Sequence, residues 1–288
     1  MKACFVILHY IDIDTTQKCI SSILQLENQD YSVVIVDNAS PNNSGALLKK
    51  VYKDNEKVEV ILLPDNVGYA RGNNIGFLYA KEVFKAEYII VANNDVIFED
   101  SKILDKIQQI FEQTNAYIIG PDVYSAANIH QNPLRSKMLN EKKIKGKIRN
   151  KAIGLLYFRI KKHLKIGDKI QIFEKMYNKG AENSIKERNW SEEADDAVLQ
   201  GACLIFTPNY VRKEYEAFDP RTFMYCEEEL LALKCERKKY NTRYSPAIQV
   251  RHMDGKSTEL ACDGTEKNLF QFSHMLKGYK LILGEMKR

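Results

Sequence analysis

Residues 31–40, YSVVIVDNAS, carry the pattern that decides the class of fold. Their first part is an apolar run rich in Val and Ile, which predicts a short strand buried on both faces. The run ends abruptly at the polar pair Asp37 and Asn38. Three further runs of the same kind predict strands at 3–8, 58–63 and 88–92.

Helical patterns separate these predicted strands, at 15–26, 44–52 and 69–84. Strand and helix in regular alternation favour a parallel sheet covered by helices on both faces. We therefore predict an α/β, Rossmann-like fold with a mostly parallel sheet flanked by helices. Further along the chain the same patterns predict a helix at 103–111, a strand at 117–119, a strand at 198–206, a helix at 224–239, a strand at 242–250 and a closing helix at 266–283.

The composition is that of a globular protein. Of 288 residues, 44% are hydrophobic and 28% are charged, which excludes a disordered or collagen-like chain. No run approaches the roughly 20 apolar residues of a spanning helix, and the first run, 3–8, is too short for the apolar core of a signal peptide. The six cysteines form no CxxC pair and lie mostly in apolar stretches, so we expect buried thiols in a reducing, cytoplasmic compartment.

The net charge of +5 is concentrated in one segment. Residues 135–165 hold twelve Lys or Arg against a single acid, Glu141, so the rest of the chain is mildly acidic. Apolar residues among the lysines form an imperfect helical stripe, a pattern typical of peripheral contact with an anionic membrane. A solvated helical face and a nucleic-acid surface are the alternatives. The segment does not interleave aromatic residues on a known nucleic-acid-reading fold, so no nucleic-acid partner is expected.

Polar residues follow each of the first four predicted strands. The carboxyl ends of parallel strands lie at one edge of a sheet, where open α/β proteins bind their ligands. These side chains are therefore expected to converge on one site. They are His9 and Tyr10 after the first strand, Asp37 after the second, Asn66, Arg71 and Asn73 in a glycine-rich stretch after the third, and Asn93, Asn94 and Asp95 after the fourth.

Each cluster suits one part of a nucleotide ligand. Asp37 can accept the N3–H of a pyrimidine, or else cap the helix that follows. The glycine-rich stretch opens a helix, and helix N–H groups together with the Arg71 guanidinium favour a diphosphate. Asp95 can hold Mg²⁺ or Mn²⁺ against phosphate oxygens, whereas a simple turn is the alternative for an Asn-Asn-Asp sequence.

Three adjacent acids, Glu227, Glu228 and Glu229, open the helix predicted at 224–239. Acids at this position can simply stabilise the helix dipole. Alternatively, one of them takes a proton from an attacking hydroxyl, because neighbouring carboxylates raise one another's pKa toward the range of a general base. His252 follows the strand predicted at 242–250, where it can reach the metal or the phosphates.

Together these stretches resemble the family 2 glycosyltransferases with a GT-A fold, particularly rhamnosyltransferase-like enzymes of bacterial surface-polysaccharide synthesis. The resemblance implies inverting transfer of a sugar from a nucleotide-diphosphate sugar, dTDP-rhamnose or a UDP-hexose. The implied acceptor is a glycan or a polyprenyl-diphosphate-linked sugar, and the implied place is the cytoplasmic side, peripheral at the inner face of the plasma membrane. The matching stretches come in the family's order, at 36–40, 66–76, 93–95, 223–231 and 250–252 with Gly255 and Ser257.

The resemblance also implies a role for individual residues. Glu228 would be the catalytic base with Glu227 as its neighbour, and Asp95 with His252 would bind Mg²⁺ or Mn²⁺. The donor-binding residues would be His9, Tyr10, Asp37, Asn66, Arg71, Asn73, Asn93, Asn94, Gly201 and Ala202. Three parts are then expected: a nucleotide-sugar-binding α/β half at 1–126, a basic helical insertion at 127–195, and an acceptor-side half at 196–288 with the catalytic acid and the C-terminal helix.

Two positions depart from the family pattern. Asn93 stands where the first Asp of a DxD motif is usual, which predicts weaker metal affinity, and Leu230 replaces a second acid. These departures keep a non-catalytic nucleotide-sugar-binding scaffold open as an alternative. A sugar nucleotidyltransferase is the other alternative, but it would need a glycine-rich basic stretch after the first strand, where 9–12 has none.

Overall fold

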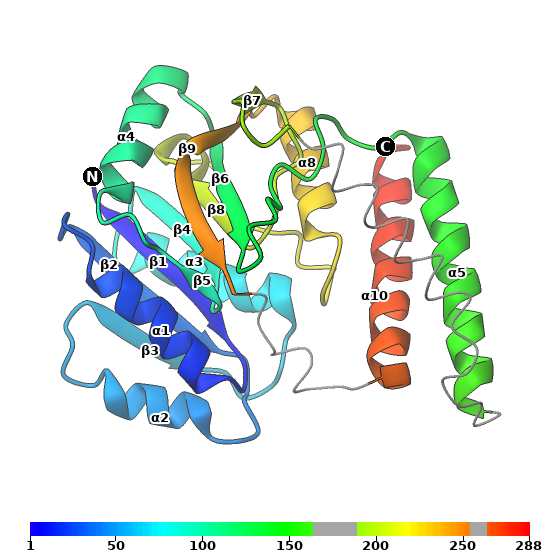
Figure 1. The fold of residues 1–288 in the computed structure, drawn as a ribbon, viewed down its shortest axis with the longest axis horizontal. Coiled ribbons are helices and arrows are strands. Elements are labelled where there is room, and N and C mark those ends of the chain that lie inside the picture. The colour runs from blue at the N-terminus through cyan, green and yellow to red at the C-terminus, as the bar shows by residue number, and fades with distance from the viewer. Residues whose placement is uncertain (164–188, 254–263) are drawn as a thin grey trace.

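The structure is a computed structural model that describes residues 1–163, 189–253 and 264–288. Its centre is one sheet in the order β3-β2-β1-β4-β8-β6-β9-β5, and β7 pairs with β9 at the side (Figure 1). The first half of the chain alternates strand and helix as predicted. Its elements are β1 (Ala3–His9), α1 (Ile13–Leu24), β2 (Tyr31–Asp37), α2 (Ser44–Val51), β3 (Val58–Leu62), α3 (Tyr69–Glu82) and β4 (Tyr88–Asn93).

Strands β1 to β4 are parallel, whereas the rest of the sheet is mixed. Strand β8 runs antiparallel to both β4 and β6, and β9 runs parallel to β6. Two short strands, β5 and β7, pair antiparallel with β9. The remaining elements are β5 (Val96–Ile97), α4 (Ile103–Thr114), β6 (Ile118–Ser125), α5 (Glu141–His163), β7 (Ala194–Asp195), β8 (Cys203–Phe206), α7 (Pro208–Val211), α8 (Glu227–Lys238), β9 (Thr242–His252) and α10 (Gly264–Glu285).

The central strands are buried on both faces, as their continuous apolar runs predicted. Along β1, Phe5 and Ile7 join a core cluster with α1, α2 and α4, whereas Cys4 and Val6 join the opposite cluster with α3, α7 and α8. This alternation is the two-residue period of a strand that packs helices on each side. The core therefore fixes β1, β2 and β4 side by side and in register.

Several boundaries differ from the sequence prediction. The strand predicted at 198–206 begins only at Cys203. Val198 forms an isolated bridge with Arg135 instead, and the chain makes a turn between Val198 and Cys203. The short elements β5, β7 and α7 were not predicted, since two to four residues carry no usable periodicity. Asp12 caps α1 by accepting a hydrogen bond from the Thr15 N–H.

The basic segment does form a helix, α5, which lies beside α10 at the edge of the molecule (Figure 1). The five cysteines in the described parts of the chain are free and buried, as expected; Cys262 lies outside them. Neither α5 nor any other described helix is long and apolar enough to cross a bilayer.

Candidate active site

The carboxyl ends of the central strands bring the first group of predicted residues together. In the register of the sheet, His9 at the end of β1 is opposite Asp37 at the end of β2, and Leu8 is opposite Asn93 at the end of β4. Strands β2 and β4 are far apart in sequence, yet each pairs directly with β1. The polar strand ends therefore share one edge of the sheet.

His9 is fully buried and works as a support for this edge. Its Nδ1 lies 2.7 Å from Thr16 Oγ1 and its Nε2 lies 2.8 Å from Ser44 Oγ, with Asp37 Oδ1 3.9 Å away. Burial lowers the pKa of His9, opposed by the negative charges of Asp37 and Asp12. The imidazole joins the end of β1 to α1 and to the start of α2 and is enclosed by protein.

Asp37 is held just as firmly. Its Oδ1 accepts a 2.5 Å hydrogen bond from Ser40 Oγ and a longer one from the Ser40 N–H. The carboxylate is 6% exposed. The predicted alternative, capping of α2, is wrong: the residue at the N-cap of α2 is Asn43, and Asp37 makes an Asx-type turn with Ser40 instead.

The glycine-rich stretch forms a tight loop into α3. Asn66 Oδ1 accepts hydrogen bonds from Asn38 Nδ2 and from the Gly68 N–H, both at 3.0 Å. Gly68 has φ +85°, and a Cβ there would lie 2.3 Å from the carbonyl oxygen of Phe223, so only glycine fits. The next residue, Tyr69, donates its N–H to that same carbonyl at 2.6 Å. The start of α3 is thus pinned to the loop that precedes the acids.

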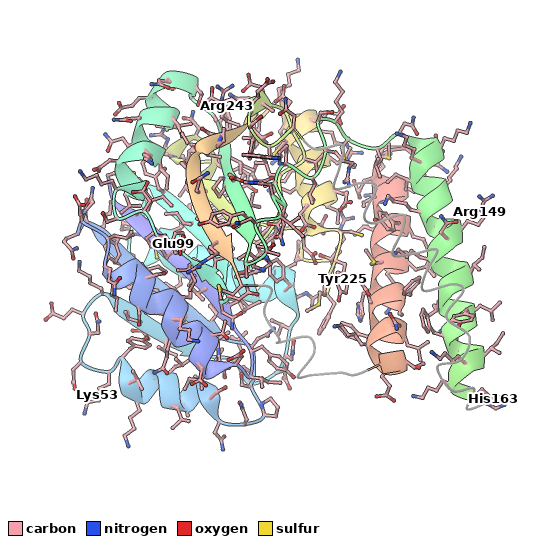
Figure 2. All side chains as sticks on the ribbon, viewed as in Figure 1. Lys53, Glu99, Arg149, His163, Tyr225 and Arg243 are labelled. Atoms are coloured by element: carbon pink, nitrogen blue, oxygen red, sulfur yellow. The ribbon has the colours of Figure 1, made fainter. Side chains whose placement is uncertain are left out.

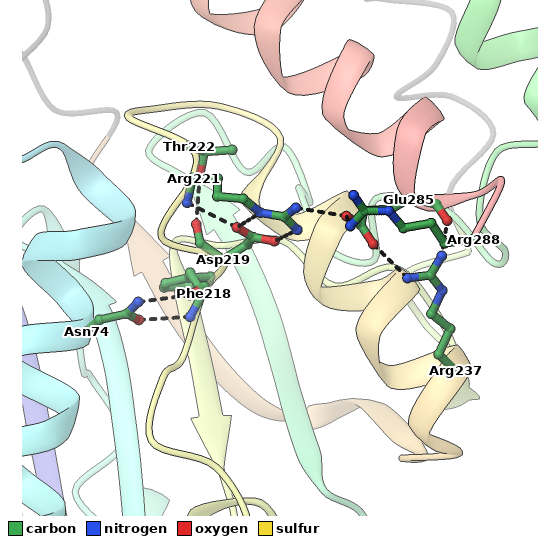
Figure 3. Close-up of polar contacts among 8 residues, drawn as sticks. All are labelled: Asn74, Phe218, Asp219, Arg221, Thr222, Arg237, Glu285 and Arg288. Atoms are coloured by element: carbon green, nitrogen blue, oxygen red, sulfur yellow. Dashed lines mark hydrogen bonds and ion pairs between the residues drawn. The ribbon is translucent and has the colours of Figure 1, made fainter.

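The loop 218–223 is itself fastened at both ends (Figure 3). On one side, the Asn74 amide exchanges two hydrogen bonds with the backbone of Phe218, at 2.8 and 2.9 Å. On the other, Arg221 pairs with Asp219 and with Glu285 at the end of α10. Arg221 and Arg237 together lower the pKa of Glu285 to about 2. Arg71, which is exposed, donates its Nε–H to the Pro220 carbonyl of this loop at 2.9 Å.

Not every predicted donor residue faces open space. Asn73 is 1% exposed and its Nδ2 bonds the Tyr69 carbonyl, while its Oδ1 is buried without a partner among the described residues. Asn94 is also buried, and its amide bonds Thr16 on α1 at 2.9 Å. Tyr10 is partly buried beside this edge. Asn73 therefore stabilises the start of α3, and Asn94 joins the end of β4 to α1.

Tyr69 is the site residue that the sequence prediction missed, although it lies inside the quoted glycine-rich stretch. Its hydroxyl lies 3.1 Å from Asn93 Oδ1 and 2.9 Å from the Gly201 carbonyl, and donates to these oxygens. Burial, followed by the charges of Glu228, Glu227 and Asp95, raises the pKa of Tyr69 well above its usual value. The phenol stays protonated, and its surroundings include acids from both halves of the chain.

The acids open α8, as predicted. Glu227 is 4% exposed and its Oε1 is buried with no hydrogen-bond partner in the described chain. Burial first, and the charge of Glu228 second, raise the pKa of Glu227 to about 8. The pKa of Glu228 is raised by burial and then by the charge of Glu229, and lowered in part by Arg135 and by a hydrogen bond from the Gly201 backbone.

The turn 200–202 lies against these acids. A Cβ on Gly201 would be 2.9 Å from Glu228 Oε1, so a side chain at 201 would push the carboxylate aside. Ala202 offers its carbonyl to the Asn93 N–H at 2.8 Å, which ties the turn to β4. Gly201 thus contacts Glu228 on one side and Tyr69 on the other.

Asp95 and His252, the two residues predicted to bind a metal, lie next to each other. His252 Nε2 lies 3.2 Å from Asp95 Oδ1, and its Nδ1 lies 2.9 Å from Gln131 Oε1. An amide oxygen only accepts, so Nδ1 carries the proton and Nε2 turns toward a carboxylate. Two acceptors at this distance need a positive charge between them, either a proton or a cation. The donor set therefore fits Mg²⁺ or Mn²⁺.

This pair alone is a sparse site. No group of three or more His, Cys, Asp or Glu side chains with metal-binding geometry occurs within 1–163, 189–253 and 264–288. Mg²⁺ is commonly held by one or two carboxylates, with substrate phosphates and water as the other ligands. A cation here would depend on the diphosphate of a donor.

Comparison with known proteins identifies the family of the chain. Residues 4–179 match the profile of the family described as Glycosyl transferase family 2. The chain belongs to glycosyltransferase family 2. Its resemblance to this family, inferred from the sequence, is confirmed.

Two characterised relatives of this family 2 chain match it over part of their length. The glycosyltransferase GlyG of Streptococcus pneumoniae serotype 4 (strain ATCC BAA-334 / TIGR4) is 28% identical over 103 residues, 36% of this chain and 33% of GlyG. The dTDP-rhamnosyl transferase RfbF of Shigella flexneri is 34% identical over 124 residues, 40% of each protein. The matched stretch thus spans well under half of either relative.

Solved structures support the fold. Staphylococcus aureus TarS 1–349 aligns with a TM-score of 0.55 at 10% identity, over 100% of this chain and 71% of that one. The mannosyltransferase PcManGT of Pyrobaculum calidifontis, solved with GDP-Man and Mn²⁺, aligns with a TM-score of 0.55 at 10% identity, over 99% of this chain and 73% of that one. The fold is the GT-A fold, as predicted.

Proposed function

We propose that this chain is an inverting glycosyltransferase that moves a sugar from a nucleotide-diphosphate sugar to a hydroxyl acceptor. The observation that carries the proposal is the position of Tyr69. Its hydroxyl contacts the end of β4 and the turn at Gly201, and it lies within electrostatic reach of Asp95 and of both glutamates. A predicted metal ligand and a predicted base are thus gathered around one side chain.

Glu228 is proposed as the general base. Its raised pKa is close to neutrality, where a carboxylate is both ionised in part and basic enough to accept a proton. The acceptor O–H gives its proton to Glu228 while its oxygen attacks the anomeric carbon. The bond from that carbon to the phosphate oxygen breaks, and the electron pair leaves with the nucleoside diphosphate. A single displacement inverts the anomeric centre.

Glu227 is proposed as the neutral neighbour of this base. With its pKa raised to about 8, its carboxyl stays largely protonated near pH 7 and can donate a hydrogen bond. A second negative charge beside Glu228 would raise the pKa of the base further. Glu227 therefore limits charge repulsion at the start of α8.

The leaving group is proposed to lie between Asp95 and the loop that begins α3. A divalent cation held by Asp95 and His252 would neutralise charge on the departing diphosphate. Arg71, in the first turn of α3, donates to the Pro220 carbonyl of the loop 218–223 and can contribute a second positive charge. Asp37, with its fixed carboxylate at the end of β2, is the proposed partner of the nucleobase.

The donor is proposed to be dTDP-rhamnose or a UDP-hexose. RfbF is named a dTDP-rhamnosyl transferase, and a thymine or uracil offers the N3–H that Asp37 can accept. TarS has been solved with UDP-GlcNAc and PcManGT with GDP-Man, so the fold accommodates more than one nucleotide sugar. The proposed acceptor is a growing glycan or a polyprenyl-diphosphate-linked sugar of a surface polysaccharide.

Helix α5 is proposed to rest on an anionic membrane surface, at the inner face of the plasma membrane. Its 23 residues include nine Lys or Arg and one acid. Leu156, Ile153 and Ile160 are 59%, 51% and 47% exposed and fall on one face at helical spacing. Arg149 extends from the same helix, away from α10 (Figure 2). Apolar anchors flanked by basic side chains suit lipid headgroups.

A liposome assay tests this contact. Binding to vesicles with an anionic phospholipid should fall as salt rises and should weaken at least severalfold in Leu156→Glu/Ile160→Glu. The matched control is Leu47→Glu, an equally exposed leucine on α2. Equal binding of both variants, or no binding at low salt, would exclude α5 as a membrane contact.

Nucleotide release tests the reaction itself. Each candidate donor is incubated with Mn²⁺ and a rhamnosylated or polyprenyl-diphosphate acceptor, and product anomers are read by NMR. Release that requires the acceptor and gives an inverted linkage supports the proposal. Donor binding without acceptor-dependent release, across the whole panel, would instead favour the non-catalytic scaffold.

A further inference from the structure

The segment 131–135 contacts three parts of the candidate site: β9, the turn 200–202 and α8. Gln131 Oε1 lies 2.9 Å from His252 Nδ1 on β9. Asn132 Oδ1 accepts the Gln200 N–H of the turn 200–202 at 2.9 Å. Arg135 Nη2 donates to Glu229 Oε1 on α8 at 2.8 Å. Three residues that are close in sequence therefore contact His252, the turn 200–202 and the acids of α8.

The backbone of this segment is firmly anchored. Leu134 and Arg135 exchange two backbone hydrogen bonds with Val198, each at 2.8 Å. The Gln131 N–H donates to the Val123 carbonyl at 2.7 Å, and the buried amide of Asn132 donates to the Pro121 carbonyl at 2.6 Å. A segment held on β6 and on residue 198 can fix the direction of the side chains it carries.

Arg135 is the first residue of the basic segment 135–165, for which a membrane contact was predicted, and its side chain pairs with an acid of α8. Its side chain is 27% exposed and its partner Glu229 is 8% exposed. The pair thus joins the start of the insertion to the first turn of α8. A guanidinium paired with a buried carboxylate at this distance is a charge-assisted, geometrically specific contact.

The charged and titratable groups around Glu228 come from several elements. Glu227 and Glu229 flank it on α8, Cys226 precedes it, Tyr69 faces it from α3, and Arg135 faces it from the insertion. Cys226 and Tyr69 are neutral because burial raises the pKa of each. Lys147 of α5 is the positive charge that acts on Cys226, and Arg135 is the positive charge that pairs with the acid next to the proposed base.

We propose that Arg135 is a positioning residue for glycosyl transfer: its pairing with Glu229 orients the first turn of α8 and offsets the negative charge beside Glu228. The inference rests on the proposed role of Glu228 as base. Without Arg135, the unpaired charge of Glu229 would hold the proton on Glu228 to higher pH. The acceptor hydroxyl would then lose its proton acceptor at neutral pH.

The test is the pH dependence of kcat/KM for the full chain with donor, Mn²⁺ and acceptor. On the acid side of the profile, kcat/KM falls as the base becomes protonated, and we call this part of the curve the acid limb. Arg135→Gln should move the acid limb to higher pH by about 0.5–1 pH unit. At a pH below the limb this is a loss of about three- to tenfold, and most of the rate should return at high pH. Arg135→Lys should retain most of the wild-type profile. The control Arg212→Gln removes an exposed arginine on α7's C-terminal side and should leave the profile unchanged.

A double-mutant cycle separates electrostatics from folding. Glu229→Gln should move the acid limb to lower pH, and Arg135→Gln/Glu229→Gln should return it close to the wild-type position. Thermal melts identify variants that lose the fold, and Glu229→Gln then still reports on the charge. An Arg135→Gln enzyme that is uniformly slower at every pH, or that matches the wild type, overturns the proposal.

The outcome also separates this inference from the proposed function. If Glu228→Gln keeps wild-type turnover, Glu228 is not the base and the proposed function itself needs another acid. If Glu228→Gln is inactive while Arg135→Gln keeps the wild-type acid limb, only the role of Arg135 is wrong.

Discussion

His9 and Asp37, at the ends of β1 and β2, differ from the acids of α8 in how completely their polar groups are hydrogen-bonded. On the nucleotide side, both nitrogens of His9 have partners and the Asp37 carboxylate accepts from Ser40. On the acid side, Glu227 buries an oxygen without a partner in the described chain, and the pKa values of Glu227 and Glu228 are both raised. A satisfied wall is pre-organised for binding, whereas a desolvated, crowded pair of acids is prepared for proton transfer.

This contrast teaches where each kind of mutation should act. Changes on the nucleotide side should weaken donor binding, and changes on the acid side should slow turnover and alter its pH dependence. The following variants test the contrast, beginning with the largest expected effect.

Glu228→Gln should reduce kcat by about 10²- to 10⁴-fold, the usual contribution of a general base. The amide cannot accept the acceptor's proton, but it nearly preserves shape, so the Kd of the donor should change little. Stopped assays for kcat and calorimetry for Kd give the two numbers. Loss of donor affinity equal to the loss of rate would break the division between the two sides.

Asp95→Ala should remove the metal-dependent part of donor binding, a loss of about 10- to 100-fold in affinity in the presence of Mn²⁺. The reason is that His252 alone provides one ligand. Donor affinity is measured with Mn²⁺ and with EDTA for both proteins. If wild-type affinity is the same in both conditions, Asp95 is not a metal ligand.

Glu227→Gln should stabilise the fold at high pH, by about 1–3 kcal/mol near pH 8. The folded-state pKa of Glu227, about 8, lies above the ordinary value of 4.5 for a glutamate, so the unfolded chain ionises first. Wild-type stability therefore falls as pH rises between these two values, and the glutamine variant should lack that fall. Denaturant melts at acidic and mildly alkaline pH measure the difference.

The opposite result for Glu227 is informative. A carboxylate that is ionised and paired in the folded state would make wild-type stability rise with pH, and Glu227→Gln would then be less stable at pH 8. That outcome would remove Glu227 as the neutral neighbour of Glu228.

Tyr69→Phe should have the smallest effect, about 1 kcal/mol on stability, with a several-fold loss of kcat. It removes the hydroxyl that joins Asn93 to Gly201 while keeping the ring on Phe218. A control of similar chemistry is Tyr79→Phe, on the same helix. Equal effects of the two variants would show that the contacts of the Tyr69 hydroxyl are not special.

Much of the fold followed from local patterns. Strands β1, β2 and β4 are mostly apolar runs, and such runs need both faces covered, so the sequence could predict helices on each side of the sheet. The two-residue strands β5 and β7 exist because β9 is already in place to pair with them. No local pattern could reveal strands that depend on a distant partner.

The same limit applied to the site. The edge that gathers Asp37, Asn93 and Asp95 follows from strand order, and the acids follow from three adjacent glutamates. Tyr69 and Arg135 could not be assigned, since their partners are 132 and 94 residues away in sequence. A hydrogen bond between residues far apart in sequence produces no repeating pattern of residue types from which it could be predicted.

The anchoring of 131–135 has a practical consequence for exchanging parts between related enzymes. A chimera that replaces the whole stretch 127–195 would also discard Asn132, whose amide holds Gln200, and Arg135, whose guanidinium holds Glu229. A junction placed after Leu139 would keep both and still transplant α5. The result of exchanging α5 between related proteins therefore depends on where the junction is placed.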